Sequence, residues 1–69
     1  MKEVRRFPKI GDIVYIYNMF GEPQYKDSTG VVTHIDDMDQ IHGTWGGCAL
    51  IGGDDYVILE PDDTTLVDF

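Results

Sequence analysis

The chain has 69 residues, of which 42% are hydrophobic and 26% charged, and its formal net charge at pH 7 is −8. A chain of this length forms one domain and buries only about 60% of the surface that its unfolded form exposes. Cys48 is the single cysteine, which excludes an internal disulfide and a cysteine-based zinc site. No apolar run approaches the roughly 18 to 20 residues of a membrane span, and "MKEVRRFPKIG" lacks the apolar core of a secretory signal, so we expect a cytoplasmic protein without membrane contact.

Charge is distributed unevenly along the sequence. Residues 1–9 carry four basic side chains and one acidic one, a sum of +3, whereas residues 10–69 carry twelve acids and Lys26, a sum of −11. The acidic part should repel nucleic acid, which is itself densely negative. We therefore expect no direct nucleic-acid binding; the acidic charge fits a protein partner with a basic surface, or solubility alone.

Taken in chain order, the sequence begins with residues 1–9, a basic N-terminal arm in which Pro8 disfavours a helix. Short runs rich in β-branched and aromatic residues then predict five strands. These runs are "DIVYIYNM" (12–19), "TGVVTHI" (29–35), "QIHGTW" (40–45), "CALI" (48–51) and "YVILE" (56–60).

Residues 61–69 are expected to form a C-terminal tail. Its apolar residues Leu66, Val67 and Phe69 either fold back over the sheet or dock into a second copy of the chain as a homodimer. The strand pattern predicts an all-β fold, in which residues 10–60 form a small five-stranded antiparallel SH3-like barrel. Closure into a barrel removes exposed strand edges, which matters in so small a domain.

Gly46 and Gly47 predict a two-residue hairpin turn that pairs Trp45 with Cys48, because glycine adopts the positive φ angles that type I′ and II′ turns require. Counting back along this hairpin gives the further pairs Thr44 with Ala49, Gly43 with Leu50 and His42 with Ile51.

The five-residue segment "DDMDQ" (36–40) is expected to close a second hairpin that pairs His34 with His42 and Ile35 with Ile41. Strand alternation then sorts these residues onto two faces. The expected core face holds Val31, Thr33, Ile35, Ile41, Gly43, Trp45, Cys48 and Leu50. The other face holds Val32, His34, His42, Thr44, Ala49 and Ile51. Gly43, in the middle of a strand, is expected to mark a bend, a bulge or close backbone packing.

The segments "GDIVYIYNMFGEP" and "TGVVTHIDDMDQIHGTWGGCALIGGDDYVIL" carry a family resemblance. They resemble a family of short bacterial and phage-borne domains known as domain of unknown function four-three-one-four. The likeness covers residues 10–60 and is most specific over residues 36–47, although Asp39 stands where the pattern has a glycine. The resemblance implies an SH3-like β fold and an association with phages and other mobile elements. It implies no established activity.

Tyr15 and Tyr17 alternate with Val14 and Ile16 along the first predicted strand, so one pair faces the core and the other faces outward. The sequence leaves both arrangements open. If Val14 and Ile16 are inside, the two tyrosines form an aromatic patch with an acidic rim that suits a basic protein surface.

Metal and catalytic sites are weakly indicated. His34 and His42 would lie close enough to share a metal ion with Asp36 as a third ligand, but two histidines without further ligand spacing are more simply two exposed imidazoles. Cys48, in acidic surroundings, is expected to be a small buried hydrophobe rather than a nucleophile. The aspartates at strand ends are expected to fix turns by accepting backbone N–H groups. We expect no metal, no cofactor and no enzymatic activity.

The sequence thus favours a non-catalytic binding protein of a phage or mobile element, an accessory or counter-defence factor that covers a basic site on a host protein. One alternative is a protein that sequesters a small nucleotide-type signal in a pocket near "HGTWGGC", where Trp45 stacks on the ligand. Another is a structural subunit of a larger assembly. The candidate binding residues are Tyr15, Tyr17, Tyr25, Asp36, Asp37, His42, Trp45, Gly46 and Gly47.

Overall fold

The computed structural model describes residues 1–61 of the chain. Its strands are β1 (Lys2–Val4), β2 (Ile13–Asn18), β3 (Ser28–Ile35), β4 (Ile41–Gly43) and β5 (Asp55–Glu60), and a short 3-10 helix, η1 (Pro23–Tyr25), lies between β2 and β3. The described residues include no helix with the length and apolar character to cross a membrane. The tail residues from 62 onward, including Leu66, Val67 and Phe69, lie outside the described part of the chain.

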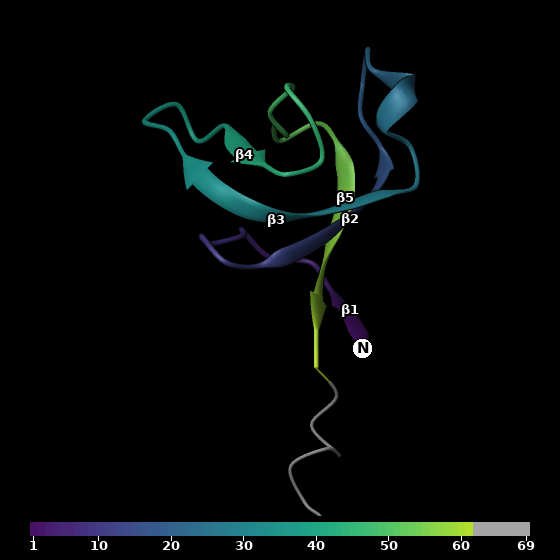
Figure 1. Cartoon of the computed structure of the whole chain (residues 1–69), viewed down its shortest axis with the longest axis vertical. Helices are drawn as coiled ribbons and strands as arrows, with labels where there is room; N and C mark the ends of the chain where they lie inside the picture. The colour runs from purple at the N-terminus through teal and green to yellow at the C-terminus, as the bar shows by residue number, and fades with distance from the viewer. Residues whose placement is uncertain (62–69) are drawn as a thin grey trace, which may run out of the picture.

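The strands form one antiparallel sheet in the order β1-β5-β2-β3-β4. The long strand β3 is curved, and β5 returns after β4 to lie beside β2 (Figure 1). The predicted all-β, five-stranded antiparallel fold is confirmed. This strand order leaves β1 and β4 at two open edges, so closure into a barrel is not confirmed.

Strand β2 places Val14 and Ile16 in the core, each with 0% of its surface exposed, and turns Tyr15 and Tyr17 to the other face. Of the two arrangements that the sequence left open for this strand, the one with Val14 and Ile16 inside is therefore the observed one. Val14 is the cross-strand partner of Ile58, which is also fully buried. The main core cluster consists of Val14, Ile16, Met19, Val32, Ile41, Trp45, Leu50 and Ile58.

The hairpin of β3 and β4 has the predicted register near its turn, where His34 pairs with His42 and Ile35 with Ile41. Further along, the register shifts between Val32 and His34, so one strand gains a residue. Such a bulge reverses which side chains face inward.

As a result Val32 is 1% exposed and Val31 is 39% exposed. The prediction that Val31 faces the core is therefore wrong, and so is the prediction that Val32 faces outward. The bulge lies opposite Gly43, which is the partner of Val32, and the expectation of a bulge or close packing at Gly43 is confirmed.

The predicted hairpin turn at Gly46 and Gly47 is wrong. The strand β4 ends at Gly43, and the chain returns to it only at Leu50, which bridges Ile41 instead of Gly43. "CALI" is thus not a strand.

The side chain of Trp45 explains this course of the chain. Trp45 is 9% exposed, and its indole lies against Gly30 and Gly43 and donates from Nε1 to the carbonyl of Cys48 at 2.8 Å. Burial of the ring therefore draws residues 44 to 48 over the core as a loop.

Strand β1, which lies in the N-terminal basic segment, was not among the predicted strands. Val4 pairs with Ile58, and Glu3 pairs with Leu59, so residues 2–4 form an edge of the sheet. With β1 counted and "CALI" removed, five strands remain, but they are a different set from the predicted five.

Aspartate side chains fix several turns, as their positions at strand ends predicted. Asp36 accepts the backbone N–H groups of Met38 and Gln40, both at 2.9 Å. Asp54 joins two separate loops, because its two oxygens accept the amides of Phe20 and Ile51, each at 2.9 Å.

Candidate functional site

The outer face of the sheet, the side away from the main core, carries two tyrosines in contact. The ring centroids of Tyr15 and Tyr17 are 4.9 Å apart and their planes meet at 57°. The Tyr15 hydroxyl donates to Asp27 Oδ1 at 2.9 Å, and the Tyr17 hydroxyl donates to Glu3 Oε1 at 2.7 Å. Each ring is thus held at its outer end by a carboxylate, one from the loop before β3 and one from β1.

Apolar side chains surround the tyrosines on this face. Cross-strand partners share a face of a sheet, which places Val57 beside Tyr15, and Leu59 and Val31 beside Ile13. Val57 is 2% exposed although it does not belong to the main core cluster, so the outer side chains cover it. We call Ile13, Tyr15, Tyr17, Val31 and Leu59, together with the acids Glu3 and Asp27, the outer-face strip.

Both tyrosines of the strip remain hydrogen-bond donors at neutral pH. The hydrogen bond to Asp27, followed by partial burial, raises the pKa of Tyr15 above its usual value. The hydrogen bond to Glu3 likewise raises the pKa of Tyr17. Each of the two tyrosines therefore presents a neutral phenol beside an exposed carboxylate.

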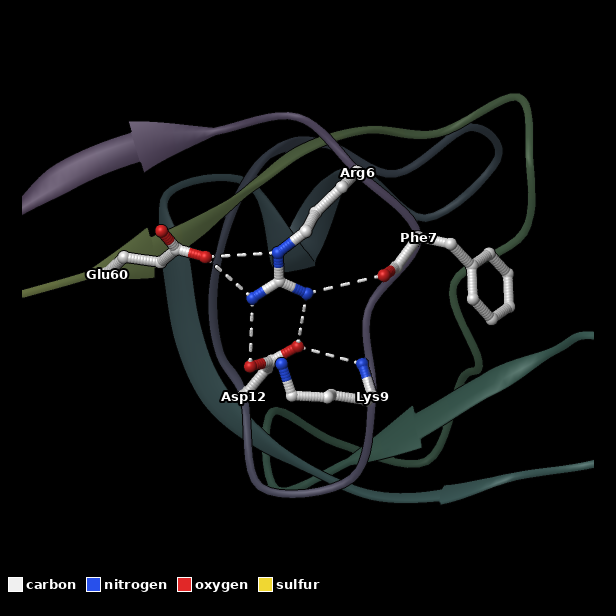
Figure 2. Close-up of polar contacts among 5 residues, drawn as sticks. All are labelled: Arg6, Phe7, Lys9, Asp12 and Glu60. Atoms are coloured by element: carbon white, nitrogen blue, oxygen red, sulfur yellow. Dashed lines mark hydrogen bonds and ion pairs between the residues drawn. The ribbon is translucent and has the colours of Figure 1, made fainter.

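A second cluster of charges lies where the chain passes from β1 to β2. Arg6 Nη1 donates to Asp12 Oδ2 at 2.8 Å, and Nη2 donates to Glu60 Oε2 at 2.8 Å. Figure 2 shows the guanidinium lying between these two carboxylates, with Nη1 also donating to the carbonyl of Phe7 at 3.3 Å. The backbone N–H of Lys9 donates to Asp12 at 2.8 Å.

These contacts make the Arg6 cluster a structural clasp that joins the N-terminal segment to β5. The hydrogen bonds from Arg6 hold the pKa of Asp12 below its usual value, and those to Asp12 and Glu60 raise the pKa of Arg6. Arg5 is also paired, with Asp55 at 3.0 Å. The basic residues in segment 1–9 are a sequence signal for ion pairs with the acidic remainder of the chain, but no local pattern identifies the partners.

The two histidines lie side by side, as the register predicted, with ring centroids 5.6 Å apart. His42 Nε2 lies 3.0 Å from Asp36 Oδ2, and this contact lowers the pKa of Asp36. Asp36 also fixes the turn through its other oxygen, and Asp37 is exposed beside it. Within residues 1–61, no group of three or more His, Cys, Asp or Glu side chains is arranged to hold a metal ion.

The segment "TWGGC" does not present the side chains that a stacking pocket requires. Trp45 lies in the core instead of on the surface, and the ring of Tyr25 lies against one side of Gly46. Gly47 is exposed, with open space around it.

The thiol of Cys48 lies at the edge of this loop. Its Sγ donates to Glu22 Oε1 at 3.1 Å, and this hydrogen bond raises the pKa of Cys48 above its usual value. A raised pKa keeps the sulfur protonated and weakly nucleophilic. The side chain packs against the core cluster, although it is only partly buried.

Comparison with known proteins gives no match to a protein-family model, a curated protein or a solved structure. The family resemblance and the phage setting therefore depend on the sequence segments quoted above. Of the predicted binding residues, Tyr15 and Tyr17 come together on one accessible face, while Trp45 and Asp36 have structural roles. Glu3 and Asp27, which complete that face, were not among the predicted binding residues.

Proposed function

We propose that this protein is a non-catalytic binding protein that covers a basic site on a partner protein with its outer-face strip. The observation that carries the proposal is the contact pair of Tyr15 and Tyr17, each bonded to an exposed carboxylate, Asp27 or Glu3. Aromatic side chains that are partly buried in a rigid sheet are typical anchors of protein interfaces. Carboxylates beside them favour a partner of positive charge.

The distribution of charge supports the same partner. Residues 1–61 contain ten acidic and five basic side chains. Two of the five basic side chains, Arg5 and Arg6, are engaged with Asp55, Asp12 and Glu60. Their positive charge is therefore matched within the protein, and the strip acids Glu3 and Asp27 remain exposed to a partner.

In this proposal the protein acts in the cytoplasm of a cell that carries a phage or other mobile element, a setting implied by the sequence resemblance. An accessory or counter-defence factor of this kind works by stoichiometric occlusion, so it needs no catalytic group. The alternative of a nucleotide-type ligand at "HGTWGGC" has less support, because Trp45 is 9% exposed and both arginines are paired elsewhere.

The test is native mass spectrometry of the tagged protein purified at low salt from cells that naturally produce it. We expect one discrete protein partner, released at high salt because screening weakens exposed charge pairs. A double variant of the strip, Glu3→Gln with Asp27→Asn, should lose at least about tenfold in affinity for this partner. The control, Asp37→Asn with Asp39→Asn, changes the net charge equally but lies outside the strip, and should lose less than about threefold.

Three results would overturn the proposal. The first is an equal loss in the strip variant and its control. The second is a mass of a few hundred daltons that remains until denaturation, which would favour the small-molecule alternative. The third is an empty monomer at all salt concentrations.

A further inference from the structure

The two tyrosines of the outer-face strip form a fixed platform. Each hydroxyl is bonded to a carboxylate that belongs to a different segment, Asp27 before β3 and Glu3 in β1. A change of rotamer about the Cα–Cβ bond would carry either hydroxyl away from its carboxylate and break the hydrogen bond. The rings also contact each other, and Val57, the cross-strand partner of Tyr15, is 2% exposed. A ligand thus meets aromatic faces that are already ordered, and it loses little free energy in ordering them.

The spacing of the rings determines how a cation can approach. A planar group sandwiched between two parallel rings needs about 7 Å between ring centroids, twice the ~3.5 Å contact distance. The centroids of Tyr15 and Tyr17 are only 4.9 Å apart and the planes are tilted by 57°. A cation therefore lies on the outer surface of the pair, within the roughly 6 Å at which a ring attracts it.

The carboxylates select among cations. The tyrosine hydroxyls donate to Oδ1 of Asp27 and Oε1 of Glu3, and a carboxylate has a second oxygen that can accept from a ligand. A guanidinium stacks its plane on an aromatic ring while its edge donates to a carboxylate. An ammonium group is a more strongly hydrated point charge without a plane to stack.

From this geometry we infer that the outer-face strip recognises arginine in preference to lysine on the basic surface of its partner. The inference rests on the proposed function and makes it more specific. The guanidinium lies on the Tyr15–Tyr17 pair and donates to Asp27 or Glu3. The protein's own Arg5 is already engaged with Asp55 at 3.0 Å.

The chain offers a closely matched pair of variants for the test. Asp27 and Asp39 are both exposed aspartates with left-handed backbone, at φ 62° and 60°. Asparagine also adopts left-handed backbone angles, so Asp27→Asn and Asp39→Asn each remove one negative charge without adding backbone strain. Asp27 belongs to the strip, whereas Asp39 lies in the turn between β3 and β4.

The probes are two capped pentapeptides, acetyl-Gly-Gly-Arg-Gly-Gly-amide and the same peptide with lysine, titrated into isotope-labelled protein and followed by NMR. We expect the arginine peptide to shift the ring signals of Tyr15 and Tyr17 and the amides of β2, with at least about fivefold higher affinity than the lysine peptide. Asp27→Asn should weaken arginine binding at least about threefold, and Asp39→Asn should leave it within twofold.

Equal affinity of the two peptides for the strip would overturn the preference for arginine while leaving the proposed function in place. If neither peptide shifts these signals at 20 mM, the arginine inference fails. The proposed function fails with it only if the natural partner is also indifferent to Glu3→Gln with Asp27→Asn.

Discussion

Replacement of Gly43 by alanine tests the packing that sets the course of the "TWGGC" loop. A Cβ atom at this position would lie 2.5 Å from the carbonyl oxygen of Val31 and 2.6 Å from Cη2 of Trp45, and nearer still to Cζ3 of the same ring. Ordinary contacts between such atoms are about 3.5 to 4.0 Å. Relief therefore requires movement of about 1 Å by the backbone of β3, by the indole, or by both.

Neither group can move without further loss. Trp45 is 9% exposed, and its indole Nε1 donates to the carbonyl of Cys48 at 2.8 Å. Overpacking in such a site costs typically 1 to 3 kcal/mol, and with two rigid neighbours we expect about 3 kcal/mol for Gly43→Ala. A domain of this size is stable by only about 3 to 10 kcal/mol, so the melting temperature should fall by roughly 12 to 24 °C.

The measurement is urea unfolding followed by the fluorescence of Trp45, the single tryptophan. Gly47→Ala is the matched control, because a Cβ there meets nothing within 4 Å and its φ is not positive. Its free energy of unfolding should stay the same or rise by up to about 1 kcal/mol. A loss below about 1 kcal/mol for Gly43→Ala, or equal losses for the two variants, would refute the packing argument.

Three further predictions concern the core, the clasp and the loops. Leu50→Ala, at 0% exposure, should cost about 2 to 5 kcal/mol in urea unfolding, whereas Ile51→Ala next to it, at 45% exposure, should change stability by about 0.5 kcal/mol or less. The paired guanidinium lowers the pKa of Asp12 in the folded state, so the stability that Asp12 contributes is complete above its unfolded pKa of about 3.9 and is lost as pH falls through the lower folded pKa. The variant Asp12→Asn lacks this titration, so its urea midpoint should decline less steeply over this acid range. An unchanged decline would contradict the assignment. Asp54→Asn leaves one acceptor oxygen where two backbone amides bind, so amide hydrogen exchange should become faster at Phe20 or Ile51. Unchanged protection of both amides would show that the loops do not depend on this carboxylate.

Local signals in the sequence predicted the parts of the fold that local interactions determine. The register of His34 with His42 was predicted correctly because the intervening turn is fixed by Asp36, whose side chain accepts two backbone N–H groups within five residues of chain. The period of two in β2 likewise separated Val14 from Tyr15. It could not say which set was inside, because that depends on burial against a strand that follows much later, where Ile58 pairs with Val14.

The errors arose where tertiary contacts override local preference. Gly46 and Gly47 have the conformational freedom for a tight turn, but burial of Trp45 against Gly43 favours a longer loop. The bulge at Val32 has no sequence signal on its own strand.

The candidate site was predicted only in part. Tyr15 and Tyr17 were identified, yet Glu3 and Asp27 are separated from them by 14 and 12 residues, so no motif links them. The Arg6 clasp was missed for the same reason, since Arg6 and Glu60 are 54 residues apart.

The position of β5 also determines when this protein can fold during its synthesis. Strand β5 is made last among the described strands, yet it lies inside the sheet between β1 and β2 (Figure 1). Until residue 60 has left the ribosome, β1 has no neighbour and β2 has only β3. The edge of β2 that pairs with β5 therefore stays unpaired until β5 has been made, and a chain cut short before β5 loses an interior strand instead of an edge. Such fragments should be cleared by proteases rather than accumulate as smaller folded forms.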